Sequence, residues 1–429
     1  MTSGNVWVMK CMPSQQFRHV KKIEDARRRF FDAIQVEVKG VDSIRLQDAV
    51  GRILARPVIS RRYLPASDLA VVDGYAVRSA DLRKASSETP GHLQLVGESN
   101  LGEACHLKIR KGQTVALATG STIPRGGDAV VMVENVRRLH GNKIEFQYAV
   151  SPCQGIMKRG EDIAPGRLVL DRGSRLRPED VGALKTLGLK RVQVVRRVQV
   201  GVLSTGNELV DSPRKNDRTK IVDLNRPILS AMLRELEAEP VDLGIVKDDE
   251  RGIRAALRTG LAKTDLVLVT AGSSVGKRDL VPDCINNLGK PGMLIHGVAM
   301  RPAMPTGLAV VRGKPVVSLP GFPVSAMLAF RTFVRPLLAK LVGASEPLDP
   351  TVTAILKEKI TGTPGHRTFV RVRVSRVKDA YVATPLKAQQ SSMLTSMVDA
   401  NGIVNVSESA PIIEAGTEVS VTLTGDLRA

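Results

Sequence analysis

Aromatic residues are rare in this sequence: its 429 residues include one tryptophan, four tyrosines and eight phenylalanines. Proteins that bind single-stranded nucleic acid stack bases on such rings, so the composition argues against that class. The charge alone would allow it, because 63 lysines and arginines against 43 aspartates and glutamates give a formal net charge of +20. However, the basic residues are scattered and their runs are short, as at Arg27-Arg28-Arg29. We therefore expect small polyanions, and no nucleic acid, as partners.

Cysteine and histidine are also few. The four cysteines are widely spaced without a C-x-x-C pair, and the six histidines include no H-x-x-x-H motif. This predicts reduced thiols in a cytoplasmic protein and no zinc site. No apolar stretch reaches the length of a transmembrane helix, and the N-terminus lacks the apolar core of a signal peptide, so we expect no membrane partner.

A short stretch near the middle, Asp265–Gly276, predicts a buried strand that ends in a turn of small residues. Leu266–Val269 is an unbroken apolar run, which is typical of a strand covered on both faces. A buried helix segment is the alternative, but the run is short for one. The small residues that follow allow backbone amides to approach a ligand, and Asp279 then precedes a helix-like segment. The stretch indicates an oxyanion site, although such turns are often plain connectors.

The flanking segments alternate between strand and helix patterns. Gln199–Leu203 and Val241–Val246 are strand-like, a helical face begins near Asn225, which we interpret as an N-cap, and a long apolar-faced helix covers Val324–Leu341. This alternation predicts a doubly wound α/β domain, whose ligands bind beyond the carboxyl ends of the strands.

Three carboxylates, Glu208, Asp248 and Asp279, each follow a predicted strand end. Together they would repel an anion unless a hard cation bridges them to phosphate oxygens, which predicts Mg²⁺. Lys277, Arg278 and Arg301 are candidate counter-charges. Helix capping is the alternative role for Asp248 and Asp279.

Six motifs, in order along the chain, resemble signatures of the MoeA/gephyrin-type molybdopterin molybdenumtransferases. They are DGYAVR (73–78), ATGSTIPRGGDAVV (118–131), KRGEDI (158–163), STGNEL (204–209), AGSSVGKRD (271–279) and LPGFPVSA (319–326). The resemblance implies that the protein inserts molybdate, or tungstate, into adenylylated molybdopterin with Mg²⁺ and releases AMP. It also implies a homodimer, and it allows a contact with a molybdopterin adenylyltransferase.

The resemblance implies an α/β multidomain protein of four domains. These are an elongated discontinuous N-terminal domain (18–61 and 164–197), an inserted β-rich domain (62–163), a central doubly wound α/β/α domain of MoaB/MogA type (198–343) and a C-terminal β domain (344–429). Within them, Val20–Ile34, Leu46–Leu54 and Val181–Leu187 have helix-like patterns, while period-two alternation predicts strands at 370–374 and 419–423.

The residues that match the family's functional positions form two groups. The expected catalytic residues are Asp73, Asp162, Glu208, Asp248 and Asp279, the last three also as metal ligands. The expected substrate-binding residues are Thr119, Asp128, Ser204, Thr205, Gly206, Gly272, Ser273, Ser274, Gly276, Arg301, Pro302, Pro305, Pro320, Gly321 and Ser391. The resemblance places Asp73, Thr119, Asp128 and Asp162 in a cleft that faces the α/β domain of the partner subunit.

Two motifs depart from the family pattern. Arg301-Pro302-Ala303-Met304-Pro305 stands where the family usually reads K-P-G-K-P or R-P-G-K-P, and Phe322 replaces the asparagine of L-P-G-N-P. A lysine is therefore missing at Met304, which predicts oxyanion binding weaker by roughly 1.5–3 kcal/mol. A divergent paralogue of archaeal type is one reading. A non-catalytic carrier or scaffold for molybdopterin or molybdate, and a molybdopterin adenylyltransferase, are the alternative functions.

Overall fold

The computed structural model describes residues 20–35, 37, 40–103, 105–212, 219–271 and 279–427. The chain divides into two compact units, one formed by Met1–Asp42 with Val195–Ala429 and the other by Ser43–Val194. The helices of the described residues are all too short or too polar to cross a bilayer. The predicted four-domain boundaries remain a prediction.

A six-stranded sheet organises the first unit, with strand order β16-β13-β17-β21-β20-β18. The strands are β13 (Gln199–Thr205), β16 (Glu239–Val246), β17 (Leu266–Ala271), β18 (Pro291–His296), β20 (Gly307–Val311) and β21 (Lys314–Pro320). β16, β13, β17 and β21 run parallel, so their carboxyl ends lie at one edge. β20 runs antiparallel between β21 and β18, which makes the sheet mixed.

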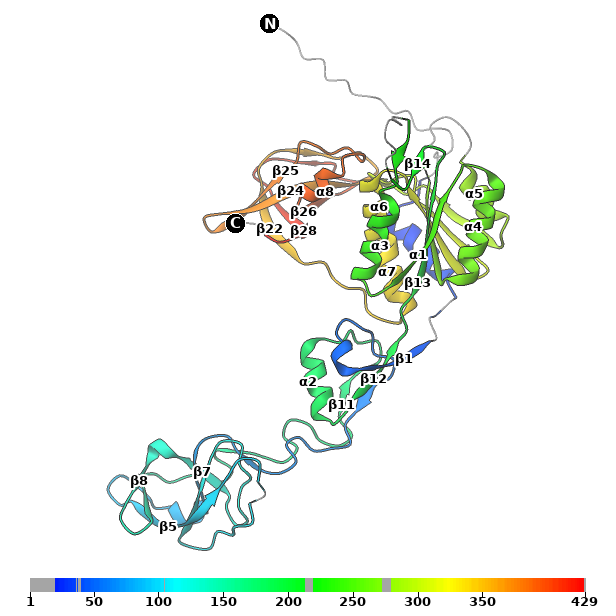
Figure 1. The fold of residues 1–429 in the computed structure, drawn as a ribbon. Helices are drawn as coiled ribbons and strands as arrows, with labels where there is room; N and C mark the ends of the chain where they lie inside the picture. The colour runs from blue at the N-terminus through cyan, green and yellow to red at the C-terminus, as the bar shows by residue number, and fades with distance from the viewer. Residues whose placement is uncertain are drawn as a thin grey trace. The chain divides into compact units, whose positions relative to one another are not determined.

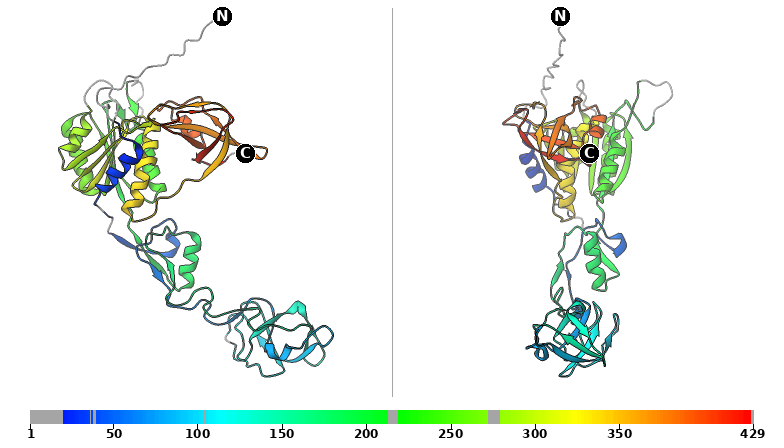
Figure 2. Two further views of the ribbon diagram at one scale, coloured as in Figure 1. Left: turned by 180° about the vertical axis from the view of Figure 1, so that it is seen from behind. Right: turned by 90° about the vertical axis from the view of Figure 1, so that its left-hand side faces the viewer.

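Helices cover both faces of this sheet. The helices are α1 (Ile23–Asp32), α3 (Asn225–Glu235), α4 (Glu250–Lys263), α5 (Leu280–Asn286), α6 (Pro323–Ala329), the π-helical turn η5 (Phe330–Val334) and α7 (Arg335–Leu341). Figure 1 shows α4 and α5 on one face and α3, α6 and α7 on the other, and the view from behind in Figure 2 agrees. The doubly wound prediction is confirmed.

Alternate residues of the strands supply the two cores. Val202 and Leu268 pack toward α3 and α6, whereas Leu203, Val267 and Val269 pack toward α4 and α5. These side chains are fully buried, and burial of each contributes about 1.5–3 kcal/mol. The strands are apolar on both sides for this reason.

The C-terminal β domain belongs to the same unit. Its main sheet contains β19 (Met300–Arg301), β22 (Thr351–Leu356), β24 (Arg367–Val377), β25 (Ala380–Pro385), β26 (Gly402–Val406) and β28 (Glu418–Leu423). Smaller elements of this domain are α8 (Thr395–Asp399) and the pair β23 (Ile360–Thr361) with β27 (Ile412–Ile413). The pair β14 (Leu209–Val210) with β15 (Ile221–Val222) lies instead in the α/β region, between β13 and α3. The strands predicted from period-two alternation are confirmed as parts of β24 and β28.

The second unit contains a six-stranded sheet of order β7-β4-β6-β5-β9-β8. Its strands are β4 (Gly74–Val77), β5 (Gly91–Ser99), β6 (Gln113–Leu117), β7 (Ala129–Met132), β8 (Val136–Arg138) and β9 (Lys143–Phe146). Two short helical turns, η3 (Ser79–Leu82) and η4 (Val133–Asn135), accompany them. The β-rich prediction for this segment is confirmed.

Shorter paired strands and one helix make up the rest of the second unit. They are β1 (Val41–Arg45) with β12 (Arg191–Val195), β2 (Val58–Ile59) with β11 (Leu168–Leu170), β3 (Leu69–Ala70) with β10 (Ile156–Met157), the helix α2 (Pro178–Thr186) and the turn η2 (Leu46–Asp48). The predicted helix at Leu46–Leu54 is wrong, because only this single 3₁₀ turn forms. The chain reverses at Gly51, whose φ of 82° suits glycine.

Candidate functional site

A cavity of about 920 Å³ opens at the carboxyl ends of the parallel strands. Its walls come from the ends of β13 and β17, the segments that follow β13, β16 and β21, β15, and the starts of α3 and α5. Ser392 adds a residue from the C-terminal β domain. Parallel α/β sheets bind ligands at this edge, so the cavity is the candidate site.

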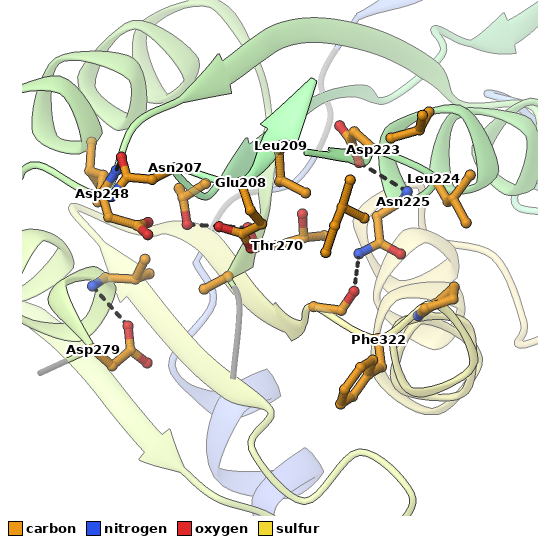
Figure 3. Close-up of a pocket in the computed structure, with 18 of the residues that line it drawn as sticks. Asn207, Glu208, Leu209, Asp223, Leu224, Asn225, Asp248, Thr270, Asp279 and Phe322 are labelled. Carbon is orange, nitrogen blue, oxygen red and sulfur yellow. Dashed lines mark hydrogen bonds between the residues drawn. The ribbon is translucent and has the colours of Figure 1, made fainter. Parts of the chain in front are cut away.

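Glu208 lies at the acidic end of the cavity, three residues after the end of β13 (Figure 3). A Cβ atom at Gly206 would come within 2.9 Å of both carboxylate oxygens of Glu208. The amide of Gly206 donates to the carbonyl oxygen of Val246, 3.1 Å away, which ties this turn to β16. Glycine at 206 therefore leaves the space that the Glu208 carboxylate occupies.

Asp248 follows β16 and also lines the cavity. Its backbone amide donates to Oδ1 of Asn207 at 3.3 Å. Loss of hydration raises the pKa of Asp248 above its ordinary value, and the negative charges of Glu208 and Asp279 raise it further. Asp249, the next residue, caps α4 by accepting from the amide of Gly252 at 2.7 Å. The capping role that the sequence allowed for Asp248 thus belongs to Asp249.

Asp279 does cap a helix. Its Oδ1 accepts from the amide of Val281 at 3.1 Å at the start of α5. Its Oδ2 lies 3.7 Å from Nε2 of His296. Because the cap uses one oxygen, the other remains oriented for a second role, and the two readings of Asp279 are compatible.

The acidic end fits a shared Mg²⁺ site. Within the described ranges, no three side chains of His, Cys, Asp or Glu are close enough to form a metal cage. Mg²⁺ does not require one, because it keeps several waters and binds through one or two carboxylates plus substrate phosphates. Burial, together with the charges of Glu208 and Asp279, raises the pKa of Asp248, and a bound cation would offset both effects. Glu208, Asp248 and Asp279 are the residues that would hold it.

The opposite end of the cavity is apolar and carries an amide. Figure 3 shows Asp223, Leu224, Asn225 and Phe322 there, away from Asp248 and Asp279. Asp223 accepts from the amide of Asn225 at 3.0 Å and from Nε of Arg226 at 2.8 Å. Asp223 therefore supports the start of α3, and the prediction that Asn225 is the N-cap is wrong. Freed from capping, the Asn225 side chain lines the cavity.

Several predicted binding residues are engaged within the sheet. Ser204 is fully buried, and its hydroxyl pairs with that of Thr270 at 2.9 Å. Thr205 also lines the cavity, although its hydroxyl is directed to the carbonyl oxygen of Thr270 at 3.4 Å. Pro320 is buried at the end of β21, and Gly321 lines the cavity. The predicted oxyanion turn, Gly272, Ser273, Ser274 and Gly276, lies outside the described residues, as do Lys277 and Arg278.

None of the residues of the departing segment Arg301–Pro305 is among those that line the cavity. Ala303 has a φ of 86°, in the left-handed region that favours glycine, and it is buried. Nε of Arg301 is buried without a partner among the described residues. The carbonyl oxygen of Ser391 accepts from the amide of Val324 at 3.2 Å, and the next residue, Ser392, lines the cavity in its place.

The second unit brings two of the predicted residues together. Asp73 precedes β4 and Thr119 follows β6, and these strands are antiparallel neighbours. Oδ1 of Asp73 accepts from the amide of Thr119 at 2.6 Å and from its hydroxyl at 2.8 Å. These two hydrogen bonds lower the pKa of Asp73 below its ordinary value.

Asp128 and Asp162 are placed differently. Asp128 accepts from the amide of Ser79 at 2.6 Å and from its hydroxyl at 2.8 Å, so it uses both carboxylate oxygens to hold η3. The backbone of Asp162 is held by two hydrogen bonds: its amide donates to the carbonyl oxygen of Leu64 at 3.1 Å, and its carbonyl oxygen accepts from the guanidinium of Arg167. The roles of Asp128 and Asp162 in a cleft shared between subunits remain predictions.

Arg371 is a residue that the sequence interpretation missed. It is fully buried on β24, and none of its three guanidinium nitrogens has a partner among the described residues. Desolvation lowers its pKa. The backbone amide and carbonyl oxygen of Arg371 form hydrogen bonds with the side-chain amide of Gln389, in the loop that leads to Ser392. A buried, unpaired guanidinium beside this loop is a candidate counter-charge for an oxyanion.

Comparisons with known proteins agree with this architecture. Family models match residues 21–188 (MoeA N-terminal region, domain I and II), 201–340 (probable molybdopterin binding domain) and 353–424 (MoeA C-terminal region, domain IV). The molybdopterin molybdenumtransferase of Bacillus subtilis is 31% identical over 383 residues, which are 89% of each chain. The chain belongs to the MoeA family.

Other members of the MoeA family support the same assignment. Molybdopterin molybdenumtransferase 2 of Mycobacterium tuberculosis (strain ATCC 25618 / H37Rv) is 30% identical and covers 88% of this chain and 94% of its own. The crystal structure of the MoeA protein from Pyrococcus horikoshii OT3 has a TM-score of 0.80 at 31% identity and covers 94% of this chain and all of its own. The predicted family and the multidomain α/β fold are confirmed, and MoeA membership places the chain among the transferases of molybdenum cofactor biosynthesis.

Proposed function

We propose that the chain inserts molybdate into adenylylated molybdopterin and releases AMP, with Mg²⁺ at the acidic end of the cavity. The observation that carries this proposal is that Glu208, Asp248 and Asp279 line one cavity, where burial, together with the charges of Glu208 and Asp279, raises the pKa of Asp248. Carboxylates do not bind a phosphoanhydride directly. They bind the cation that accompanies it.

The two ends of the cavity have different roles in this proposal. At the acidic end, Asp248 and Asp279 would hold the cation, and the hydrogen bond from the amide of Val281 fixes the Asp279 carboxylate. Mg²⁺ bound there would neutralise the charge that develops as AMP leaves. At the other end, Asn225 and the apolar residues around it bind the organic part of the substrate and exclude water.

The second unit supplies the remaining groups in our proposal. Asp73 and Thr119 form a pre-arranged carboxylate and hydroxyl pair, which the family resemblance places in a cleft that faces the α/β domain of a partner subunit. We propose a homodimer as the working form. Mixing the variants Asp73→Ala and Asp279→Ala tests it, because subunit exchange would restore one intact cleft and part of the activity. No recovery in exchanged mixtures would refute the shared cleft.

Two alternative functions make different predictions for the same assay. Purified full-length protein is incubated with adenylylated molybdopterin, Mg²⁺ and either molybdate or tungstate, and AMP is measured. A transferase releases AMP only when the oxyanion is present. A molybdopterin adenylyltransferase instead consumes ATP in the presence of molybdopterin, and a carrier binds its ligand without releasing AMP.

A further inference from the structure

Phe322 is an exposed aromatic side chain on the wall of the cavity. It is 46% exposed, whereas Phe30, Phe146, Phe330 and Phe333 are fully buried. It stands where the resembled family has an asparagine, and it cannot cap the helix that begins at the next residue. Leu224 and Ile221, which line the same cavity, are also exposed, at 41% and 59%. Among the described residues, this end of the cavity therefore has apolar surface that no side chain covers.

Hydrogen bonds fix the backbone from which the Phe322 ring projects. The carbonyl oxygen of Phe322 accepts from the amide of Ala326 at 3.0 Å, and Pro323 follows in the first turn of α6. The carbonyl oxygen of the preceding Gly321 accepts from Nδ2 of Asn225 at 2.7 Å. The ring is thus carried by a helix start that is bonded to α3 across the cavity, which reduces the ordering required on binding.

Asn225 contributes an unused acceptor beside this ring. A carbonyl oxygen can only accept, so the contact with Gly321 identifies the amide nitrogen and leaves Oδ1 as the free atom. Asn225 is 7% exposed, and Oδ1 has no partner within the described residues. A buried acceptor without a donor destabilises a protein, which indicates that a ligand supplies the donor.

We propose that Phe322 and Asn225 together bind a flat, amino-substituted heterocycle of the substrate. The ring of Phe322 stacks on the heterocycle, and Oδ1 of Asn225 accepts from its exocyclic amino group. This inference rests on the proposed function, whose substrate carries two such heterocycles, adenine and the pterin, on either side of the phosphates. Phe322 is then a specificity-determining residue that this chain has in place of an amide.

Binding measurements distinguish the two heterocycles. Calorimetric titrations of the full-length protein use AMP, ribose 5-phosphate and 6-hydroxymethylpterin, with Phe322→Leu as the variant that keeps apolar bulk but removes the ring. We expect the affinity for AMP or for the pterin to fall about tenfold in Phe322→Leu and to recover in Phe322→Tyr. Ribose 5-phosphate, which has no base, should bind both proteins equally. Leu348→Ala, at a side chain 92% exposed and far along the chain, is the matched control.

Ligand analogues test Asn225 without altering the protein. Inosine monophosphate and 6-hydroxymethyllumazine carry a carbonyl oxygen where AMP and the pterin carry the amino group, so Oδ1 would repel them. We expect the analogue of the bound heterocycle to bind at least about tenfold more weakly. Loss restricted to the AMP pair assigns the site to adenine, and loss restricted to the pterin pair assigns it to the pterin.

The proposal is overturned if neither heterocycle binds the parent protein at millimolar concentration. It is also overturned if Phe322→Leu binds both as the parent does, or if ribose 5-phosphate loses the same affinity. These measurements need neither molybdate nor turnover. Failure of AMP release in the parent would therefore refute the proposed function while the heterocycle site is judged separately.

Discussion

Two short hydrogen bonds join Asp73 to Thr119 at the ends of two neighbouring antiparallel strands. Oδ1 of Asp73 accepts from both the amide and the hydroxyl of Thr119, at 2.6 and 2.8 Å. Forty-six positions separate the two residues in the chain, and the register that aligns Gly74 with Leu117 brings them together. An exposed carboxylate with a lowered pKa is thereby fixed in one orientation.

Removal of the hydroxyl in Thr119→Val should raise the pKa of Asp73 toward its ordinary value, because one of the two hydrogen bonds to the charged form is lost. In the parent, the pKa is lower when folded, so the pair stabilises the fold above the unfolded pKa, and this stability is lost as pH falls through the folded pKa. A carbon-detected NMR titration of Asp73 measures the shift. Ser86→Ala, whose hydroxyl bonds only within its own turn, is the control. An unchanged titration in Thr119→Val would contradict this reading.

Asp248→Asn should make the protein more stable at pH 7 and less active. The folded pKa of Asp248 is raised, so its charged form is disfavoured once pH exceeds the unfolded pKa, and a neutral side chain relieves that penalty. The gain should vanish at pH values below the unfolded pKa, where both proteins are neutral at this position. Denaturant unfolding at several pH values in metal-free buffer checks it. Asp249→Asn, which keeps the cap of α4, should change neither quantity. A less stable Asp248→Asn at pH 7 would refute the raised pKa of Asp248.

Asp279→Asn should retain the helix cap but lose AMP release. Asparagine accepts from the amide of Val281 as aspartate does, so the melting temperature should stay nearly constant. The matched variant Asp249→Ala should behave in the opposite way, because it loses the cap of α4, at a cost of about 0.5–2 kcal/mol, and no cavity carboxylate. If Asp279→Asn melts much lower and still turns over, capping is its whole role.

The strand ends and their carboxylates were predictable because parallel strands deliver the residues that follow them to one edge. Asn225 was misread, because asparagine is a common N-cap, whereas in the structure Leu224 occupies the N-cap position and the carboxylate of Asp223 accepts from the amide of Asn225. Arg371 lies on the outward face of a strand whose neighbours Val370 and Val372 pack inward. The alternation of inward and outward side chains along β24 would predict that Arg371 is exposed to water. However, Ile403, which lies opposite Arg371 on β26, packs in the core of the α/β domain. Burial between two domains has no local signal in the sequence.

Two substitutions in the loop Arg301–Pro305, which departs from the family pattern, separate the effect of its backbone strain from the effect of its missing charge. Ala303→Gly should stabilise the fold by about 0.5–1 kcal/mol, since the φ of 86° is strained for alanine. Met304→Lys should leave stability nearly unchanged and should tighten molybdate binding by about one to two decades. Thermal unfolding and the molybdate dependence of AMP release distinguish the two. Equal molybdate dependence in the parent and in Met304→Lys would show that the missing lysine is irrelevant to binding.

The most direct test of the proposed function is a single-turnover experiment. Full-length protein is loaded with adenylylated molybdopterin and Mg²⁺, molybdate is added, and AMP is measured over time beside Asp279→Asn and a sample with EDTA. The account predicts a burst of one AMP per intact site that requires molybdate and Mg²⁺ and is absent in Asp279→Asn. Release of AMP without molybdate, or an equal burst in Asp279→Asn or in EDTA, would contradict it.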